Sequence, residues 1–326
     1  MKSNKTREEL KKVFIDCLNE EIIPWEKPWY MIYMQNGISQ HRYRGCNALL
    51  LGLMAQIKHY QDPRWYTFNQ IRDNQYKLIK GSKGVPVEYW LLFNKKENKY
   101  LSFEQAKIEI KKNPDIEKFL QLRCRTSYVF NADCIQGLPE YKLTSHPILI
   151  GTDLEIALDQ LIKGMDIDVR ISDFANSAYY QPTEDYVSIP SPKVFKSESG
   201  YASTLLHELA HATGHSKRLN RDLTGKFGSE KYAMEELRVE LAASLLSEFF
   251  PYELTEKHLD NHKAYIQSWI SVLDNDPNIL FRAIKEAEQI ADYMENIVGL
   301  DLYVVNDEQM LDYSSNSSQN LTLEIF

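Results

Sequence analysis

The spacing of hydrophobic residues divides the chain into segments with a helical period and segments with strand character. In the first 130 residues, the helical period covers 7–23, 45–58 and 103–123, and residues 85–93 form a β-rich run that glycine and proline introduce. Farther along, the same criteria predict helices at 154–162, 199–214, 230–249, 255–273 and 277–298, and strands at 167–171 and 186–189. The mixture predicts an α+β fold.

A change in composition near the middle of the chain predicts a domain boundary. Residues 126–150 contain Gly137, Pro139 and Pro147, which interrupt the periodic pattern. The residues after 300 are acidic and rich in serine and asparagine, which is typical of a tail outside a packed domain. We therefore predict a small mixed domain at 1–130, a mainly helical domain with a small sheet at 131–300, and a C-terminal tail at 301–326.

The two parts of the chain differ in charge. Residues 1–125 hold 23 lysines and arginines against 14 acidic residues. The remaining residues hold 15 basic against 32 acidic side chains, so the net charge of the whole chain is -8. A positive excess confined to the first part suggests a polyanionic partner there. The overall composition, with 43% hydrophobic and 26% charged residues, is that of a globular protein and excludes a collagen-like or wholly disordered chain.

No segment of the sequence has the composition of a membrane anchor. The longest apolar run, residues 48–55, is far shorter than the roughly 20 residues that span a bilayer. The start of the chain is charged and lacks the apolar core of a secretory signal. We expect a cytoplasmic protein without a membrane partner and with reduced thiols, because no CxxC pair occurs among Cys17, Cys46, Cys124 and Cys134.

A metal-binding motif occurs in the second part of the chain. Residues 207–211 read His-Glu-Leu-Ala-His, and Gly214 supplies a helix stop shortly after them. On a helix, His207 and His211 lie on one face and can bind the same ion, and Glu208 beside them can act as a general base toward water. The sequence therefore predicts a catalytic site with one zinc ion.

A catalytic zinc site needs a third protein ligand. The metzincin pattern would place a histidine at 217, where Lys217 stands, and His215 follows the helix stop, so we assign His215 a supporting or turn role. In a second helix, Glu236 and Glu240 share a face, whereas Glu235 is expected to point elsewhere. We predict that Glu236 is the ligand and that Glu240 supports a ligand histidine, with the reverse assignment as the alternative.

The first part of the chain also carries side chains that suit single-stranded DNA. Such DNA is bound by cationic grooves that contain aromatic rings on which bases stack. Amide side chains can add hydrogen bonds to the bases or the backbone. The candidate residues are Trp25, Trp29, Tyr43, Arg44, Asn47, Trp65, Phe68, Gln70, Lys80 and Lys83.

Several short motifs, in their order along the chain, make the sequence resemble the ArdC-type antirestriction proteins of conjugative plasmids, mobile elements and phages. The similarity covers roughly residues 5–298. Two departures are Cys46, where the family usually has a bulky hydrophobe, and the acidic tail. The motifs are Pro24-Trp25, Pro28-Trp29, Tyr43–Asn47, Trp65–Gln70, Lys80–Gly84, Tyr128–Asp133, Ala178–Tyr180, His207–His215, Arg218–Arg221, Glu235–Glu240 and Ala264–Ile270.

The resemblance implies an N-terminal single-stranded-DNA-binding domain, a zincin-like metallopeptidase domain with a gluzincin-like site, and protection of incoming DNA from host restriction. On this view the partners are single-stranded DNA and an unidentified host protein that the peptidase cleaves. An alternative is a protein that masks DNA and whose metal domain is structural. A third hypothesis is a general cytosolic peptidase whose basic half docks its substrate.

Overall fold

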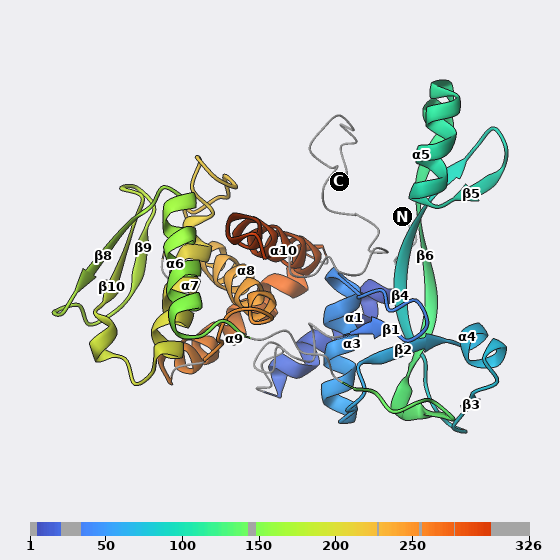
Figure 1. Cartoon of the computed structure of the whole chain (residues 1–326), viewed down its shortest axis with the longest axis horizontal. Coiled ribbons are helices and arrows are strands. Elements are labelled where there is room, and N and C mark those ends of the chain that lie inside the picture. Colours follow the sequence, from blue (N-terminus) through green and yellow to red (C-terminus); the bar gives the residue numbers. More distant parts are fainter. Residues whose placement is uncertain are drawn as a thin grey trace.

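A computed structural model describes residues 5–20, 34–142, 148–226, 228–253, 256–276 and 278–300. Figure 1 shows an N-terminal half built around a sheet and a C-terminal half built mainly from helices. The α+β class predicted from the sequence is confirmed. Among the described residues, no helix combines the length and the apolar character needed to cross a bilayer.

The N-terminal half contains a five-stranded sheet with the order β1-β2-β6-β4-β5. All neighbouring strands in it are antiparallel except the pair β1 and β2. A second, two-stranded sheet pairs β3 with β7. The elements are α1 (Lys5–Asn19), β1 (Gln35–Asn36), α3 (Gly45–Lys58), β2 (Arg64–Thr67), α4 (Phe68–Asp73), β3 (Lys77–Leu78), β4 (Val85–Asn94), β5 (Lys99–Leu101), α5 (Phe103–Lys112), β6 (Leu120–Asn131) and β7 (Ile135–Gln136).

The C-terminal half places five helices beside a three-stranded sheet with the order β8-β10-β9 among the described residues. Strands β8 and β10 are parallel, and β9 is an antiparallel edge strand. The elements are α6 (Gly151–Gly164), β8 (Asp168–Ser172), β9 (Tyr179–Gln181), β10 (Tyr186–Pro190), α7 (Glu198–Ala212), α8 (Glu230–Leu246), α9 (Glu256–Asn275) and α10 (Ile279–Val298).

The largest difference from the predicted elements lies at 103–123. A single helix was expected there, but α5 ends at Lys112, a 3-10 helix covers Pro114–Phe119, and β6 begins at Leu120. Pro114 lacks a backbone N–H and clashes with a preceding helical turn, so the α-helix cannot continue through it. The periodic charge pattern therefore extended the predicted helix into a segment that pairs with β4.

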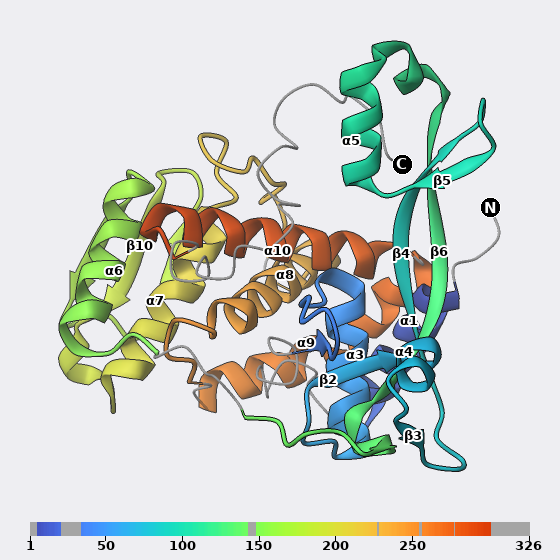
Figure 2. The ribbon, with the colours of Figure 1, turned by 45° about the vertical axis from the view of Figure 1, so that its right-hand side comes forward.

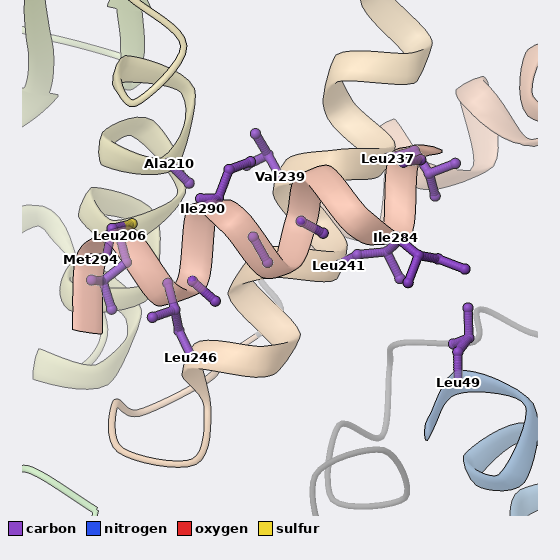
Figure 3. Close-up of a cluster of buried hydrophobic side chains, with 14 of the residues drawn as sticks. Leu49, Leu206, Ala210, Leu237, Val239, Leu241, Leu246, Ile284, Ile290 and Met294 are labelled. Carbon is purple, nitrogen blue, oxygen red and sulfur yellow. The ribbon is translucent and has the colours of Figure 1, made fainter. Parts of the chain in front are cut away.

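The two halves share one hydrophobic core. Side chains of α1 and α3 are buried in the same cluster as those of α8, α9 and α10. Figure 3 shows Ile284 and Ile290 of α10 near Leu237 and Val239 of α8, with Leu49 of α3 beyond them. Polar contacts add to this interface, because Glu288 of α10 accepts a hydrogen bond of 2.7 Å from the backbone N–H at the start of α3. The halves are therefore packed directly against each other.

The domain limits 1–130, 131–300 and 301–326 remain a prediction. Strand β6 ends at Asn131, and β7 at 135–136 still pairs with β3 of the N-terminal half. The tail at 301–326 lies outside the described residues.

Candidate functional site

The metal-binding motif lies on α7, a helix that is buried over most of its length. Ser197 begins the helix by accepting a hydrogen bond of 2.9 Å from the N–H of Gly200, which satisfies one donor of the first turn. His207 and His211 are one turn apart and face the same side, with their Nε2 atoms 3.2 Å apart. Both imidazole rings are nearly buried and converge on one point.

Helix α8 brings a carboxylate to the same point. The two carboxylate oxygens of Glu236 lie 3.6 Å from Nε2 of His207 and 3.4 Å from Nε2 of His211. One ligand atom from each of the three residues lies within 4.8 Å of the others. Glu240 approaches the opposite edge of the His207 ring, with its Oε1 3.4 Å from Nδ1. The structure thus groups His207, His211 and Glu236, and it places Glu240 behind a histidine.

The electrostatic field at this point favours a cation. Burial would lower the pKa of His207 and His211, but the neighbouring carboxylates together raise both pKa values above the ordinary one. Glu236 acts on both rings, Glu240 acts on His207, and Glu235 acts on His211. Burial would raise the pKa of Glu236, but the two histidines lower it well below its usual value. Two imidazole nitrogens and one carboxylate oxygen are a donor set of catalytic zinc sites, so these residues fit a divalent ion.

Glu235 corrects the expectation that its side chain points away from the site. It is 5% exposed, and its Oε1 lies 3.7 Å from Nδ1 of His211. Arg221 donates a hydrogen bond of 2.7 Å to the same oxygen. Burial would raise the pKa of Glu235, but His211 and Arg221 lower it to about 2. Each of the two candidate ligand histidines therefore has a carboxylate at its second nitrogen, an arrangement that fixes the ring and its tautomer.

Helical geometry explains why Glu235 was missed. Successive residues on a helix differ by about 100°, so Glu235 and Glu236 leave α8 in different directions. They still reach the same imidazole, because its two nitrogens face different sides. A sequence signal for Glu235 was available in Arg221, a cation shortly after α7 that needs an acidic partner. Arg221 donates hydrogen bonds of 2.6 Å to Thr213 and 3.0 Å to the Ala210 carbonyl, which hold it at the end of α7, beside Glu235.

Glu208 lies beside the metal-binding residues and is 8% exposed. Burial raises the pKa of its carboxyl group, and the neighbouring Glu236 adds to this, whereas the two histidines lower it. The backbone N–H of Tyr180 on the edge strand β9 faces this carboxylate and also lowers its pKa. The Glu208 carboxyl group thus has a raised pKa and lies between α7 and the small sheet.

His215 has its contacts in the turn after α7, which favours the turn role over the supporting role of the two that the sequence left open. Its Nδ1 lies 3.4 Å from Oδ2 of Asp185, and its carbonyl accepts hydrogen bonds from the N–H groups of Arg218 and Asn220. Arg218 also donates a 2.7 Å hydrogen bond to the carbonyl of Ala212 at the end of α7. His215 therefore belongs to the turn that ends the helix, because the chain leaves the helical path after Thr213.

Three of the residues predicted to bind DNA have structural contacts. Trp65 is fully buried, and its indole N–H donates to the sulfur of Met34, so its ring offers no face for a base. The Asn47 amide forms hydrogen bonds of 2.7 and 2.8 Å with the backbone of Glu88. Gln70 completes the N-terminal cap of α4. The expectation for Trp65 is corrected, since burial excludes stacking.

The other described candidates divide into exposed side chains and side chains that neighbouring residues hold. Phe68 is 57% exposed, and Lys80 and Lys83 are exposed on the glycine-containing turn before β4. Tyr43 packs partly into the core. Arg44 pairs with Asp292 of α10 at 2.5 Å and with Glu288 at 3.6 Å. Trp25 and Trp29 lie outside the described residues.

Comparison with known protein families gives one match in each half of the chain. Residues 4–130 match a family described as the N-terminal domain of anti-restriction factor ArdC. Residues 156–286 match a family of zincin-like metallopeptidases. The α7 and α8 residues of the candidate metal site all lie within the second match.

Individual relatives cover nearly the whole chain. The DNA primase TraC of Escherichia coli is 34% identical over 88% of this chain, which spans only 20% of the primase. An uncharacterized protein, y4eC, of Sinorhizobium fredii (strain NBRC 101917 / NGR234) is 32% identical over 79% of this chain and 80% of its own length.

A solved structure, the antirestriction protein ArdC from the R388 plasmid, has a similar fold. Its Mn(II)-bound form gives a TM-score of 0.67 at 30% identity and covers 90% of this chain and 97% of that one. Its metal-free form gives 0.68 at 28% identity and covers 91% and 99%. The two family matches and this coverage place the chain in the family of ArdC-type antirestriction proteins.

Proposed function

We propose that this protein binds single-stranded DNA through its N-terminal half, carries a zinc-dependent peptidase site in its C-terminal half, and protects incoming mobile-element DNA from host restriction. The observation that carries the peptidase proposal is the grouping of His207, His211 and Glu236 with Glu208 beside them. A purely structural site has no need of a buried carboxyl group with a raised pKa next to its ligands.

The residues of the site divide the work between them. His207, His211 and Glu236 would hold the ion, and Glu235 and Glu240 would keep the two imidazole rings oriented. When bound, a divalent ion supplies Lewis-acid polarisation of a carbonyl group and makes water more acidic. Glu208 has a raised pKa and can accept a proton and return it to a leaving amine.

The substrate of this site would be an extended peptide segment of a host protein. Strand β9 is an edge strand of its sheet, and Tyr180 in it touches Glu208 through the backbone. A peptide that adds to this edge by main-chain hydrogen bonds would pass alongside the proposed general base.

For the DNA-binding half, exposed candidates support the proposal. Phe68 offers an aromatic ring, and Lys80 and Lys83 offer cations near it in sequence. A cationic surface with exposed rings is the chemistry of proteins that bind single strands without strong sequence preference. The excess of basic over acidic residues in 1–125 points the same way.

The Glu208→Gln variant tests the peptidase part. Glu208 is not a ligand, so the variant should keep its metal and its affinity for single-stranded DNA while protection against a restriction nuclease falls by at least about 100-fold. The matched control is Glu198→Gln, an exposed position on the same helix. Protection that survives in Glu208→Gln would instead support DNA masking with a structural metal domain.

A further inference from the structure

Strands β4 and β6 form a long two-stranded ribbon that leaves the rest of the N-terminal half. Ten consecutive residues of β4, Val85–Asn94, pair with Leu120–Val129 of β6. Figure 2 shows this ribbon extending from the region of α1, α3 and α4 to the hairpin strand β5 and helix α5. Nothing in the sequence analysis assigned a function to its residues.

The pairing register places a set of aromatic and cationic side chains on one face of this ribbon. Tyr89 pairs with Arg125, and Phe93 pairs with Tyr100 of β5. Directly paired residues share a face, and so do residues two apart along a strand. Arg123 lies two residues before Arg125, so it belongs to the same face. We call these five residues the ribbon face.

Contacts join the five side chains into one row. The Arg125 guanidinium lies 4.0 Å from the centre of the Tyr100 ring, and Arg125 is paired directly across the strands with Tyr89. The rings of Tyr100 and Phe93 are 4.9 Å apart, and the Arg123 guanidinium lies 5.9 Å from the Phe93 ring. Three rings and two guanidinium groups therefore form one continuous set of contacts along the ribbon.

The same face changes character along its length. Near the base of the ribbon, Val85, Val87 and Val129 are at most 5% exposed and belong to the core. Farther out, Tyr89 is 41% exposed and Tyr100 is 40% exposed. These rings lie outside the buried cluster and adjoin one another, and a contiguous set of exposed rings, unlike a single one, is typical of a binding surface.

We propose that the ribbon face is a surface on which single-stranded DNA lies. This inference rests on the proposed DNA binding and adds its location. Tyr89, Phe93 and Tyr100 offer rings for unstacked bases, and Arg123 and Arg125 offer planar cations that contact phosphates and also stack on bases. Residues 81–130 hold ten lysines and arginines against six acidic residues, which complements a polyanion. Paired DNA hides its bases and would gain little from the rings.

The test measures binding of a fluorescent oligothymidylate of about 20 nucleotides to the full-length protein, with the same sequence in duplex form as a comparison. Loss of one stacking ring in Tyr100→Ala, or of the cation in Arg125→Ala, should raise Kd for the single strand about tenfold or more. Tyr100→Phe keeps the ring and should bind nearly as tightly as the wild type. Arg125→Ala should also make the dependence on salt less steep.

The matched control is Arg170→Ala. Arg170 is an exposed guanidinium in the C-terminal half, away from the ribbon. It lies 3.6 Å from the centre of the Tyr186 ring, as Arg125 lies over Tyr100, and it also pairs with Asp168 at 2.7 Å. Its removal should leave Kd unchanged. Thermal unfolding of each variant identifies any loss of folding, which exposed positions should not cause.

The outcomes separate this inference from the function on which it rests. If the wild type does not bind the single strand, the proposed DNA binding itself fails. If the wild type binds and Tyr100→Ala and Arg125→Ala bind equally well, the DNA lies elsewhere and the ribbon proposal is overturned. Equal weakening of duplex and single-strand binding would also overturn it, because it would exclude base stacking.

Discussion

The candidate metal site and the ribbon face of the N-terminal half differ in how far neighbouring groups constrain each side chain. At the metal centre, His207 and His211 each meet a carboxylate at both ring nitrogens, and nearly all of these groups are buried. Buried charges require partners, so each residue there constrains the next one. On the ribbon face, exposed rings and guanidinium groups contact one another but are also in contact with solvent. In a buried polar site, each charged residue therefore indicates that a partner lies nearby. In an exposed binding surface, only the strand pairing shows which residues lie together.

Among these predictions, the largest effect is expected for metal affinity when a candidate ligand is replaced. Glu236→Gln replaces a carboxylate that lies near both histidines, so metal affinity should fall by more than the ~100-fold that loss of a supporting carboxylate costs. Competition with a chelator, followed by metal analysis, measures it. Glu230→Gln, at an exposed position of the same helix, is the control. Retained metal in Glu236→Gln together with lost metal in Glu240→Gln would show the reverse ligand assignment.

The second prediction concerns two aromatic residues that were both expected to contact DNA. Trp65→Ala should lower the free energy of unfolding by about 3–5 kcal/mol, because it empties a fully buried position. Phe68→Ala should change it by less than about 0.5 kcal/mol, because that ring is 57% exposed. Urea denaturation measures both. A Trp65→Ala protein that is as stable as the wild type would mean that this ring is not part of the core.

The smallest effect on metal affinity is expected for Glu235, the carboxylate that was expected to point elsewhere. Glu235→Gln removes the negative partner of His211 Nδ1, so metal affinity should fall about 10- to 100-fold. Glu240→Gln, which acts on His207 in the same way, provides the comparison. Melting of the metal-free variants reports the separate cost of leaving Arg221 without this partner. Unchanged metal affinity in Glu235→Gln would limit Glu235 to its ion pair with Arg221.

Helical periodicity was enough to predict most of the helices in the C-terminal half. The predicted helices at 199–214 and 230–249 correspond to α7 and α8, and the spacing of four residues within each places the candidate ligands on facing sides. In the N-terminal half, the predicted strand at 85–93 corresponds to β4. The start of its partner β6, Leu120–Arg123, was assigned to a helix, and no strand was predicted over the rest. Without β6, no sequence pattern could bring Arg125 beside Tyr89.

The sequence by itself determined the motif of His207, Glu208 and His211, the presence of a carboxylate pair on a second helix, the division of charge between the two parts, and the family. These features depend on spacing within one helix or on composition, which are local properties of the chain. Only the tertiary structure decided that Glu235 reaches His211, that Trp65 is buried, and that rings and guanidinium groups lie together on the ribbon face. Each of those facts requires contact between segments far apart in the chain, and the pairing of strands or the packing of helices determines such contacts.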